Sequence, residues 1–149
     1  MIERHAHTGT DSLRVRYPNI EIAPNVTTTI VLKDTDAATA ANYDAFFHAP
    51  WPCEVVSIKE SHKTAGTDVG AVTLMIEKRT GTQTKTNGVD VLASTFNLKA
   101  AVETYQEGTM TATAANRQLS IGDKLGLETA GTLTAVAHVV VTVEVRRTF

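Results

Sequence analysis

Hydrophobic and polar residues alternate with a period of two along most of the chain beyond residue 26. In one such segment Val72, Leu74 and Ile76 share a face, while Thr73 and Glu77 fall on the other. Alternation of this kind predicts strands of antiparallel sheets with one covered face. The longest alternating segment ends the chain, and its odd positions are all apolar: Leu133, Ala135, Ala137, Val139, Val141, Val143 and Val145. We expect one long strand there.

The side chains on the apolar faces are expected to form the core. They are Leu32, Val56, Ile58, Leu74, Ile76, Leu125, Val139, Val141 and Val143. Burying one such side chain contributes roughly 1.5–3 kcal/mol.

Turn residues separate these segments. Thr80-Gly81-Thr82 closes one predicted strand, and Gly122-Asp123 precedes another that starts at Leu125 and Leu127. Asp favours turns because its side chain accepts hydrogen bonds from nearby backbone, and Gly favours them because it tolerates positive φ. The pattern therefore predicts many short connected strands.

One segment fits two periods. A helix over Leu92 to Ala101 is compatible with the spacing, but the Thr-rich flanks favour a strand running through Leu98, Ala100 and Val102. No other segment has a helical period long enough to cover a sheet. The expected fold is an all-β antiparallel β-sandwich, more specifically a jelly roll.

Residues 1–25 differ from the β-sandwich domain expected over residues 26–149. This N-terminal arm is polar, is interrupted by Pro18 and Pro24, and has too few apolar residues for a core of its own. Its alternating stretch from Leu13 to Tyr17 is typical of an edge strand. We expect the arm to bind a neighbouring subunit, with contacts from Val15, Tyr17 and Ile20.

Composition narrows the possible partners. The 149 residues carry a formal net charge of -2, so the basic excess of a nucleic-acid-binding protein is missing. No apolar run approaches the roughly 20 residues that span a bilayer, and the polar start does not resemble a signal peptide. The sequence therefore predicts neither a nucleic-acid nor a membrane partner. Cys53 is the single cysteine, which excludes an intrachain disulfide and fits synthesis in a reducing compartment.

Histidines are the first candidates for metal chemistry. His5 and His7, two apart on an extended chain, would point to one side and could offer two ligands. The alternative is a pair of exposed histidines in the arm, since no carboxylate or third histidine lies nearby. We predict no metal site and no cofactor. His62 and His138 are expected to be surface or hydrogen-bonded histidines.

Cys53 and Trp51 are the other residues of interest. A catalytic cysteine needs a base and an orienting group, whereas Cys53 opens a predicted strand, where a buried hydrophobic role is commoner. Trp51, between two prolines, is expected to plug an end of the sandwich or to anchor an interface. No glycine-rich phosphate loop, GxSxG or CxxC motif is present, and the chain is expected not to be an enzyme.

The order of several segments resembles small structural proteins of tailed bacteriophage virions. The segments are Phe46 to Pro50, Thr64 to Asp68, Val72 to Lys78, Leu98 to Ala100, Leu119 to Leu125, the Thr/Ala/Val-rich terminal strand and the start at His5. The resemblance implies a non-enzymatic jelly-roll module, most often a head decoration (cement) protein on the capsid surface. It would be made in the host cytoplasm, and it transfers no catalytic residue.

Two function classes follow. A cement protein would bind several subunits of the major capsid protein, as a homo-oligomer on the particle. The alternative is a receptor- or glycan-binding module of a head fibre or tail structure. Glycan binding favours exposed aromatic side chains, for which one Trp and three Tyr leave few candidates.

Overall fold

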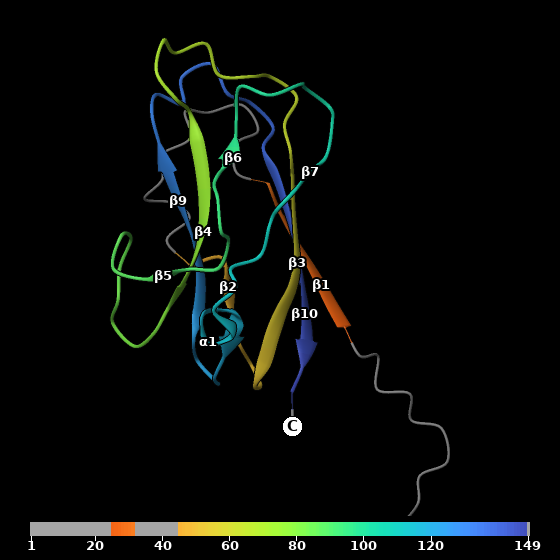
Figure 1. Ribbon diagram of the computed structural model, residues 1–149, viewed down its shortest axis with the longest axis vertical. Helices are drawn as coiled ribbons and strands as arrows, with labels where there is room; N and C mark the ends of the chain where they lie inside the picture. The colour runs from red at the N-terminus through yellow and green to blue at the C-terminus, as the bar shows by residue number, and fades with distance from the viewer. Residues whose placement is uncertain (1–24, 32–44, 149) are drawn as a thin grey trace, which may run out of the picture.

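The computed structural model describes residues 45–148 and the backbone of residues 25–31, which form two antiparallel sheets packed face to face (Figure 1). The expected all-β sandwich is therefore confirmed. The jelly-roll topology and the boundary at residue 25 stay predictions. No helix among the described residues is long and apolar enough to cross a bilayer.

The first sheet has the strand order β1-β10-β3-β7, with the short β8 also pairing with β3. Its strands are β1 (Asn25–Val31), β3 (Cys53–Ser61), β7 (Gln106–Glu107), β8 (Gln118–Leu119) and β10 (Val140–Arg147). Among the described strands β1 pairs only with β10, so β1 forms one margin of this sheet and β7 the other.

The second sheet has the order β2-β9-β4-β5, with β6 pairing with β4. Its strands are β2 (Phe47–His48), β4 (Thr73–Arg79), β5 (Val89–Asp90), β6 (Phe96–Asn97) and β9 (Lys124–Ala130). A single helical turn, α1 (Ala114–Arg117), leads into β8. Since β4 and β9 pair over their full length, they form the centre of this sheet.

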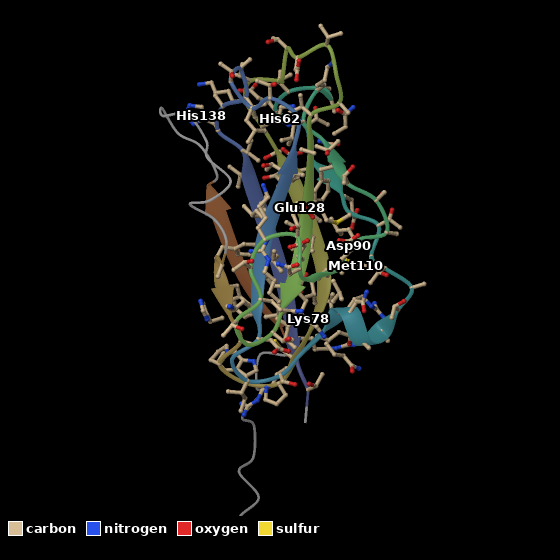
Figure 2. The ribbon with its side chains drawn as sticks, turned by 90° about the vertical axis from the view of Figure 1, so that its left-hand side faces the viewer. His62, Lys78, Asp90, Met110, Glu128 and His138 are labelled. Atoms are coloured by element: carbon tan, nitrogen blue, oxygen red, sulfur yellow. The ribbon has the colours of Figure 1, made fainter. Side chains whose placement is uncertain are left out.

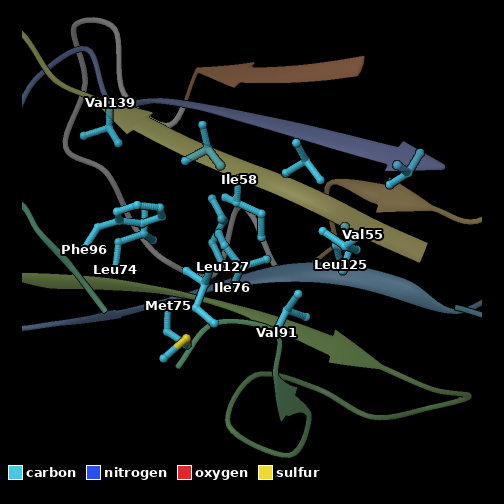
Figure 3. Packing of buried hydrophobic residues seen from close by; sticks show 14 of the residues in the cluster. Val55, Ile58, Leu74, Met75, Ile76, Val91, Phe96, Leu125, Leu127 and Val139 are labelled. Atoms are coloured by element: carbon cyan, nitrogen blue, oxygen red, sulfur yellow. The ribbon is translucent and has the colours of Figure 1, made fainter. Parts of the chain in front are cut away.

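Apolar side chains from both sheets meet between the layers (Figure 3). Seven residues of the predicted core are fully buried: Ile58, Leu74, Ile76, Leu125, Val139, Val141 and Val143. Leu32 lies outside the described residues. The alternation of the sequence was thus correct at seven of the eight predicted core positions that the structure describes.

Val56 was wrongly predicted to lie in the core, because a β-bulge reverses the alternation in β3. Glu144 of β10 lies opposite Ser57, whereas Val145 lies opposite Val55, so Val56 is the extra residue. Val55 is fully buried as a result, and Val56 is only partly buried. Alternation alone does not reveal the inserted residue.

The long terminal strand expected from Leu133 is also wrong, since β10 begins only at Val140. A turn, in which Val136 donates its N–H to the carbonyl of Leu133 at 3.0 Å, occupies the first part of the segment. His138 then has a φ of 52°, a left-handed conformation that a strand does not accommodate.

The segment from Leu98 to Tyr105 is neither the expected strand nor the alternative helix. After the two residues of β6, the side chain of Asn97 accepts a hydrogen bond from the N–H of Lys99 at 3.0 Å. The N–H of Ala100 bonds the carbonyl of Asn97 at 3.1 Å. This Asn-centred turn competes with strand extension and ends it.

The predicted turns are confirmed. Gly81 and Gly122 both have positive φ, 52° and 86° respectively. At the second turn, Asp123 accepts the N–H of Ser120 through Oδ2 at 2.8 Å and donates its own N–H to the Ser120 carbonyl at 3.0 Å. These bonds explain why β9 begins directly after the turn.

Candidate functional site

Three loops meet at one end of the sandwich: residues 62–72, 98–105 and 131–139 (Figure 1). The N–H of Gly66 bonds the carbonyl of Leu98 at 2.8 Å, and the N–H of Thr64 bonds that of Ala137 at 3.2 Å. Lys99 Nζ donates to the carbonyl of Asp68 at 2.6 Å. We call this region the loop end. Its loops are connected to one another by direct hydrogen bonds.

Asp68 joins the first and third of these loops. Its Oδ2 accepts the N–H of Thr132 at 3.1 Å. The hydrogen bonds from the side chain and backbone of Thr132 lower the pKa of the Asp68 carboxyl, which therefore holds the loops as a carboxylate at neutral pH.

A buried polar network lies beneath the loop end. Glu60 and His62 are almost completely inaccessible to solvent, and His62 Nδ1 lies 2.9 Å from Glu60 Oε1. His62 Nε2 lies 3.2 Å from the carbonyl oxygen of Ala100. Gln106 Nε2 donates to Glu60 Oε2 and, at 3.0 Å, to the carbonyl of Asn97. The network thus fastens both ends of the 98–105 loop.

Donor and acceptor roles determine the protonation of the pair formed by Glu60 and His62. The Ala100 carbonyl can only accept, so Nε2 of His62 carries a proton. The contact at Nδ1 then joins either an imidazolium to a carboxylate or a neutral imidazole to a carboxylic acid. Burial raises the pKa of Glu60, and its hydrogen bonds with His62 and Gln106 oppose that rise. In both forms the pair holds one shared proton.

Two hollows lie side by side at and below the loop end, and Tyr105 borders both. The upper hollow, of about 380 Å³, is lined by Ser61, Lys63, Glu103 and His138 among others. Figure 2 shows His62 and His138 at this end of the molecule.

The lower hollow, of about 340 Å³, is lined by Lys59, Glu107 and Thr142 as well as Tyr105. The Tyr105 side chain is largely exposed, at 72% of its residue surface. An exposed aromatic ring between two hollows of mixed polar and apolar lining is a typical element of a binding surface.

Two residues that line the upper hollow have a left-handed backbone. Glu103 has a φ of 55° and His138 a φ of 52°. Non-glycine residues adopt this conformation at a cost of order 1–3 kcal/mol, and such residues cluster at functional sites. The N–H of Glu103 donates to the carbonyl of His62 at 2.7 Å, which fixes one of the two.

A second polar cluster lies on the outer face of the other sheet. Carboxylate oxygens of Glu77, Asp90 and Glu128 lie within 4.8 Å of one another. Arg79, fully buried, binds Glu77 with its Nη2 at 2.8 Å. Hydrogen bonding to Glu77, burial and the charges of Glu77 and Asp90 raise the pKa of Glu128.

The loop after β4 covers this cluster. A side chain at Gly88 would place Cβ 2.6 Å from the carbonyl oxygen of Lys78 and 2.9 Å from Cγ of Arg79, so only glycine permits the close passage. Carboxylates are ligands that Ca²⁺ accepts, but Arg79 already neutralises part of the charge here. The raised pKa of Glu128 also favours its neutral form, which is a weaker ligand for a cation.

Cys53 is fully buried at the start of β3, as the sequence predicted. Burial raises the pKa of its thiol, and the charge of Asp123 raises it further. A nucleophilic cysteine needs the opposite shift. Cys53 therefore acts as a small core residue.

Trp51 is half-buried and packs against the core at the end opposite the loop end, as expected for a plug. The Arg147 guanidinium carbon lies 5.8 Å from the ring centroid, within range of a cation–π contact. The indole Nε1 is buried and has no hydrogen-bond partner among the described residues.

Several predicted site residues cannot be placed. Val15, Tyr17 and Ile20, the expected arm contacts, and the histidine pair His5 and His7 all lie outside the described residues. Their roles stay predictions.

Sequence reasoning missed both polar clusters. The available signal was a Glu two residues before a His on one predicted strand. Glu60 and His62 then fall on one face, and Lys59 and Ser61 fall on the other. Glu77 falls among the polar positions of the alternation in β4, which suggested exposure, whereas the loop above that face buries it.

No model of a known protein family, no curated protein and no solved structure matches the chain.

Proposed function

We propose that this chain is a non-enzymatic structural protein of a tailed-phage virion, which decorates and stabilises the capsid by binding several subunits of the major capsid protein. It would act on the capsid surface, as a homo-oligomer on the particle. The observation that supports this proposal best is the margin of the first sheet formed by β1.

The seven residues of β1 pair with β10 on one side only, among the described strands. The free side of such a strand presents unpaired N–H and C=O groups, which form a template for a strand from another chain. The 24 residues that precede β1 in sequence include the alternating stretch from Leu13 to Tyr17. A strand margin directly continuous with such an arm suits attachment to neighbouring subunits.

Trp51 supports the same proposal from another position. Buried N–H groups nearly always have an acceptor, and its Nε1 has none among the described residues. This N–H is enclosed by the chain itself, so the part of the side chain that a partner can contact is the exposed part of the half-buried ring; tryptophan is enriched at binding hot spots.

Removal of residues 1–24 tests the proposal. The chain that begins at Asn25 should keep its melting temperature within a few degrees, because the core formed by the described residues lies after Asn25. It should occupy empty expanded capsids at well below the saturating copy number of the full chain, measured by co-sedimentation and gel densitometry.

The substitution Trp51→Phe in the full chain provides a second variant, which keeps an aromatic side chain but removes part of the indole surface that a partner could contact. Reduced occupancy with unchanged melting temperature is expected. If full-length protein fails to bind capsids at all, the capsid role is wrong. If the truncated chain binds as well as the full chain, the arm does not contribute to attachment.

A second function class, a receptor- or glycan-binding module of a head fibre or tail structure, is favoured by the exposed ring of Tyr105 at the loop end. Binding of the purified chain to cells rather than to capsids would support this alternative.

A further inference from the structure

We propose that the surface on either side of Tyr105 is a carbohydrate-binding site, which takes an extended oligosaccharide along the outer face of the first sheet. This proposal rests on the second function class named above, glycan binding, and does not depend on capsid attachment.

The site is built from consecutive rows of cross-strand residues. Thr142 of β10 lies opposite Lys59 of β3, which lies opposite Glu107 of β7, and these three residues line the lower hollow. In the next row on the same face, nearer the loop end, Val140 lies opposite Ser61, and both residues line the upper hollow.

Tyr105 immediately precedes β7 and borders both hollows. The two hollows therefore form one elongated surface with the tyrosine at its middle. We call this surface the Tyr105 groove.

The fold holds the chain segment that carries this ring in place, although the side chain is exposed. The neighbouring Gln106 is tied to Glu60 and Asn97, and the carbonyl of Ala100 is tied to His62. Buried polar groups cost stability unless they are fully hydrogen-bonded, and here their bonds converge on the loop that carries Tyr105. A binding surface held in this way loses little entropy when a ligand binds.

The lining indicates a polyhydroxylated ligand. The groove offers hydroxyl groups from Ser61 and Thr142 and charged groups of both signs, including Lys59 and Glu107. Tyr105 and Val140 supply apolar surface. Sugars present C–H groups on a ring face and hydroxyl groups around its edge, so one face can stack on the tyrosine while the edge bonds the polar lining. Each hollow is near the lower end of the size of small-molecule sites, roughly 300–1,000 Å³.

A protein ligand fits the groove less well. Peptide sites need apolar pockets for anchor side chains or an open strand edge. Among the described strands, the edge beside Tyr105 is β7, which has only two residues and is a short template for an added strand.

The test uses the full chain on a printed array of neutral and acidic oligosaccharides, followed by NMR titration with soluble maltohexaose, chitohexaose and oligomeric sialic acid. We expect binding of at least one oligosaccharide class, with amide shifts concentrated at Lys59, Ser61, Tyr105 and Thr142. Tyr105→Ala should weaken that binding by about tenfold, as expected for the loss of one stacking contact.

Two variants control for indirect effects. Tyr105→Phe keeps the ring and should bind within about threefold of the original chain, because the stacking face is retained. Ile121→Ala changes a residue that is 71% exposed at the opposite end of the sandwich and should bind normally.

Three results would each overturn the proposal. In the first, folded full-length protein binds nothing on the array and none of the three soluble probes. In the second, the Tyr105→Ala protein binds as tightly as the original chain. In the third, the amide shifts are confined to residues outside the groove.

Discussion

A single imidazole connects the interior of this sandwich to its candidate binding surface. His62 contacts Glu60 on one side and the carbonyl of Ala100 on the other, and its own carbonyl accepts the N–H of Glu103. Loss of the shared proton would leave Nδ1 facing a carboxylate lone pair, or Nε2 facing a carbonyl lone pair. The contacts of His62 therefore tie the loop before Tyr105 to a buried polar pair.

Replacing His62 with alanine should destabilise the domain in a pH-dependent manner. The change removes the hydrogen bond and the charge that oppose the raised pKa of Glu60. A group whose folded pKa is raised contributes stability below its ordinary value, here 4.5, and that stability is lost as pH rises through the folded pKa. Removal of one partner of a buried pair costs about 3–5 kcal/mol. We expect a loss of this order at pH 8 and a smaller loss at pH 5, measured by urea denaturation.

The exposed neighbour Lys63 provides the control, because surface substitutions stay within about 0.5 kcal/mol. Lys63→Ala should be neutral at both pH values. Equal destabilisation of the His62→Ala protein at pH 5 and pH 8 would show that the imidazole acts only by filling space.

At the scale of the strands, alternation predicted the interior wherever pairing is regular. It identified Leu74 and Ile76 in β4 and Val141 and Val143 in β10, because side chains on a pleated strand point to opposite faces in turn. It failed at Val56, where the register of the pairing strand, not the local sequence, places the extra residue. Pairing between distant segments is not visible in a single strand.

The candidate site was less predictable than the core for the same reason. Lys59, Glu107 and Thr142 are distant in sequence and become neighbours only through the pairing of three strands. Tyr105 lies in a segment that was expected to continue as a strand and instead follows the turn at Asn97. The low aromatic content predicted few candidate side chains for glycan binding, and only the fold indicates which aromatic ring is exposed.

The bulge in β3 gives a direct test of register. Val55→Asp should unfold the domain, since it places a charge without a partner in the fully buried core. Val56→Asp, one residue along, should lower the melting temperature by only a few degrees because that side chain is half-buried. Circular dichroism melts of the two proteins provide the comparison. If Val56→Asp destabilises the domain more than Val55→Asp, β3 alternates regularly and the bulge is wrong.

At the scale of the whole molecule, the first sheet has two margins with different surroundings. The margin at β1 presents an unpaired strand edge among the described strands, and the margin at β7 carries Tyr105. One row of residues connects them, from Thr29 through Thr142 and Lys59 to Glu107. Three strand spacings separate the ends of this row by roughly 14 Å.

That separation between β1 and the margin at Tyr105 predicts that removal of residues 1–24 and Tyr105→Ala have independent effects, since positions farther apart than about 7–10 Å without shared partners usually show additive effects. The chain that begins at Asn25 should bind oligosaccharides as the full chain does, measured by NMR titration, while its capsid occupancy falls. Tyr105→Ala should reverse this pattern, with normal capsid occupancy and weakened oligosaccharide binding. Capsids decorated with the full chain should then capture the same oligosaccharides as the free protein, because the Tyr105 groove lies on the face of the sheet, whereas the proposed attachment uses the strand edge at β1. If saturating oligosaccharide instead releases the protein from capsids, the two surfaces overlap, and the capsid must cover the groove.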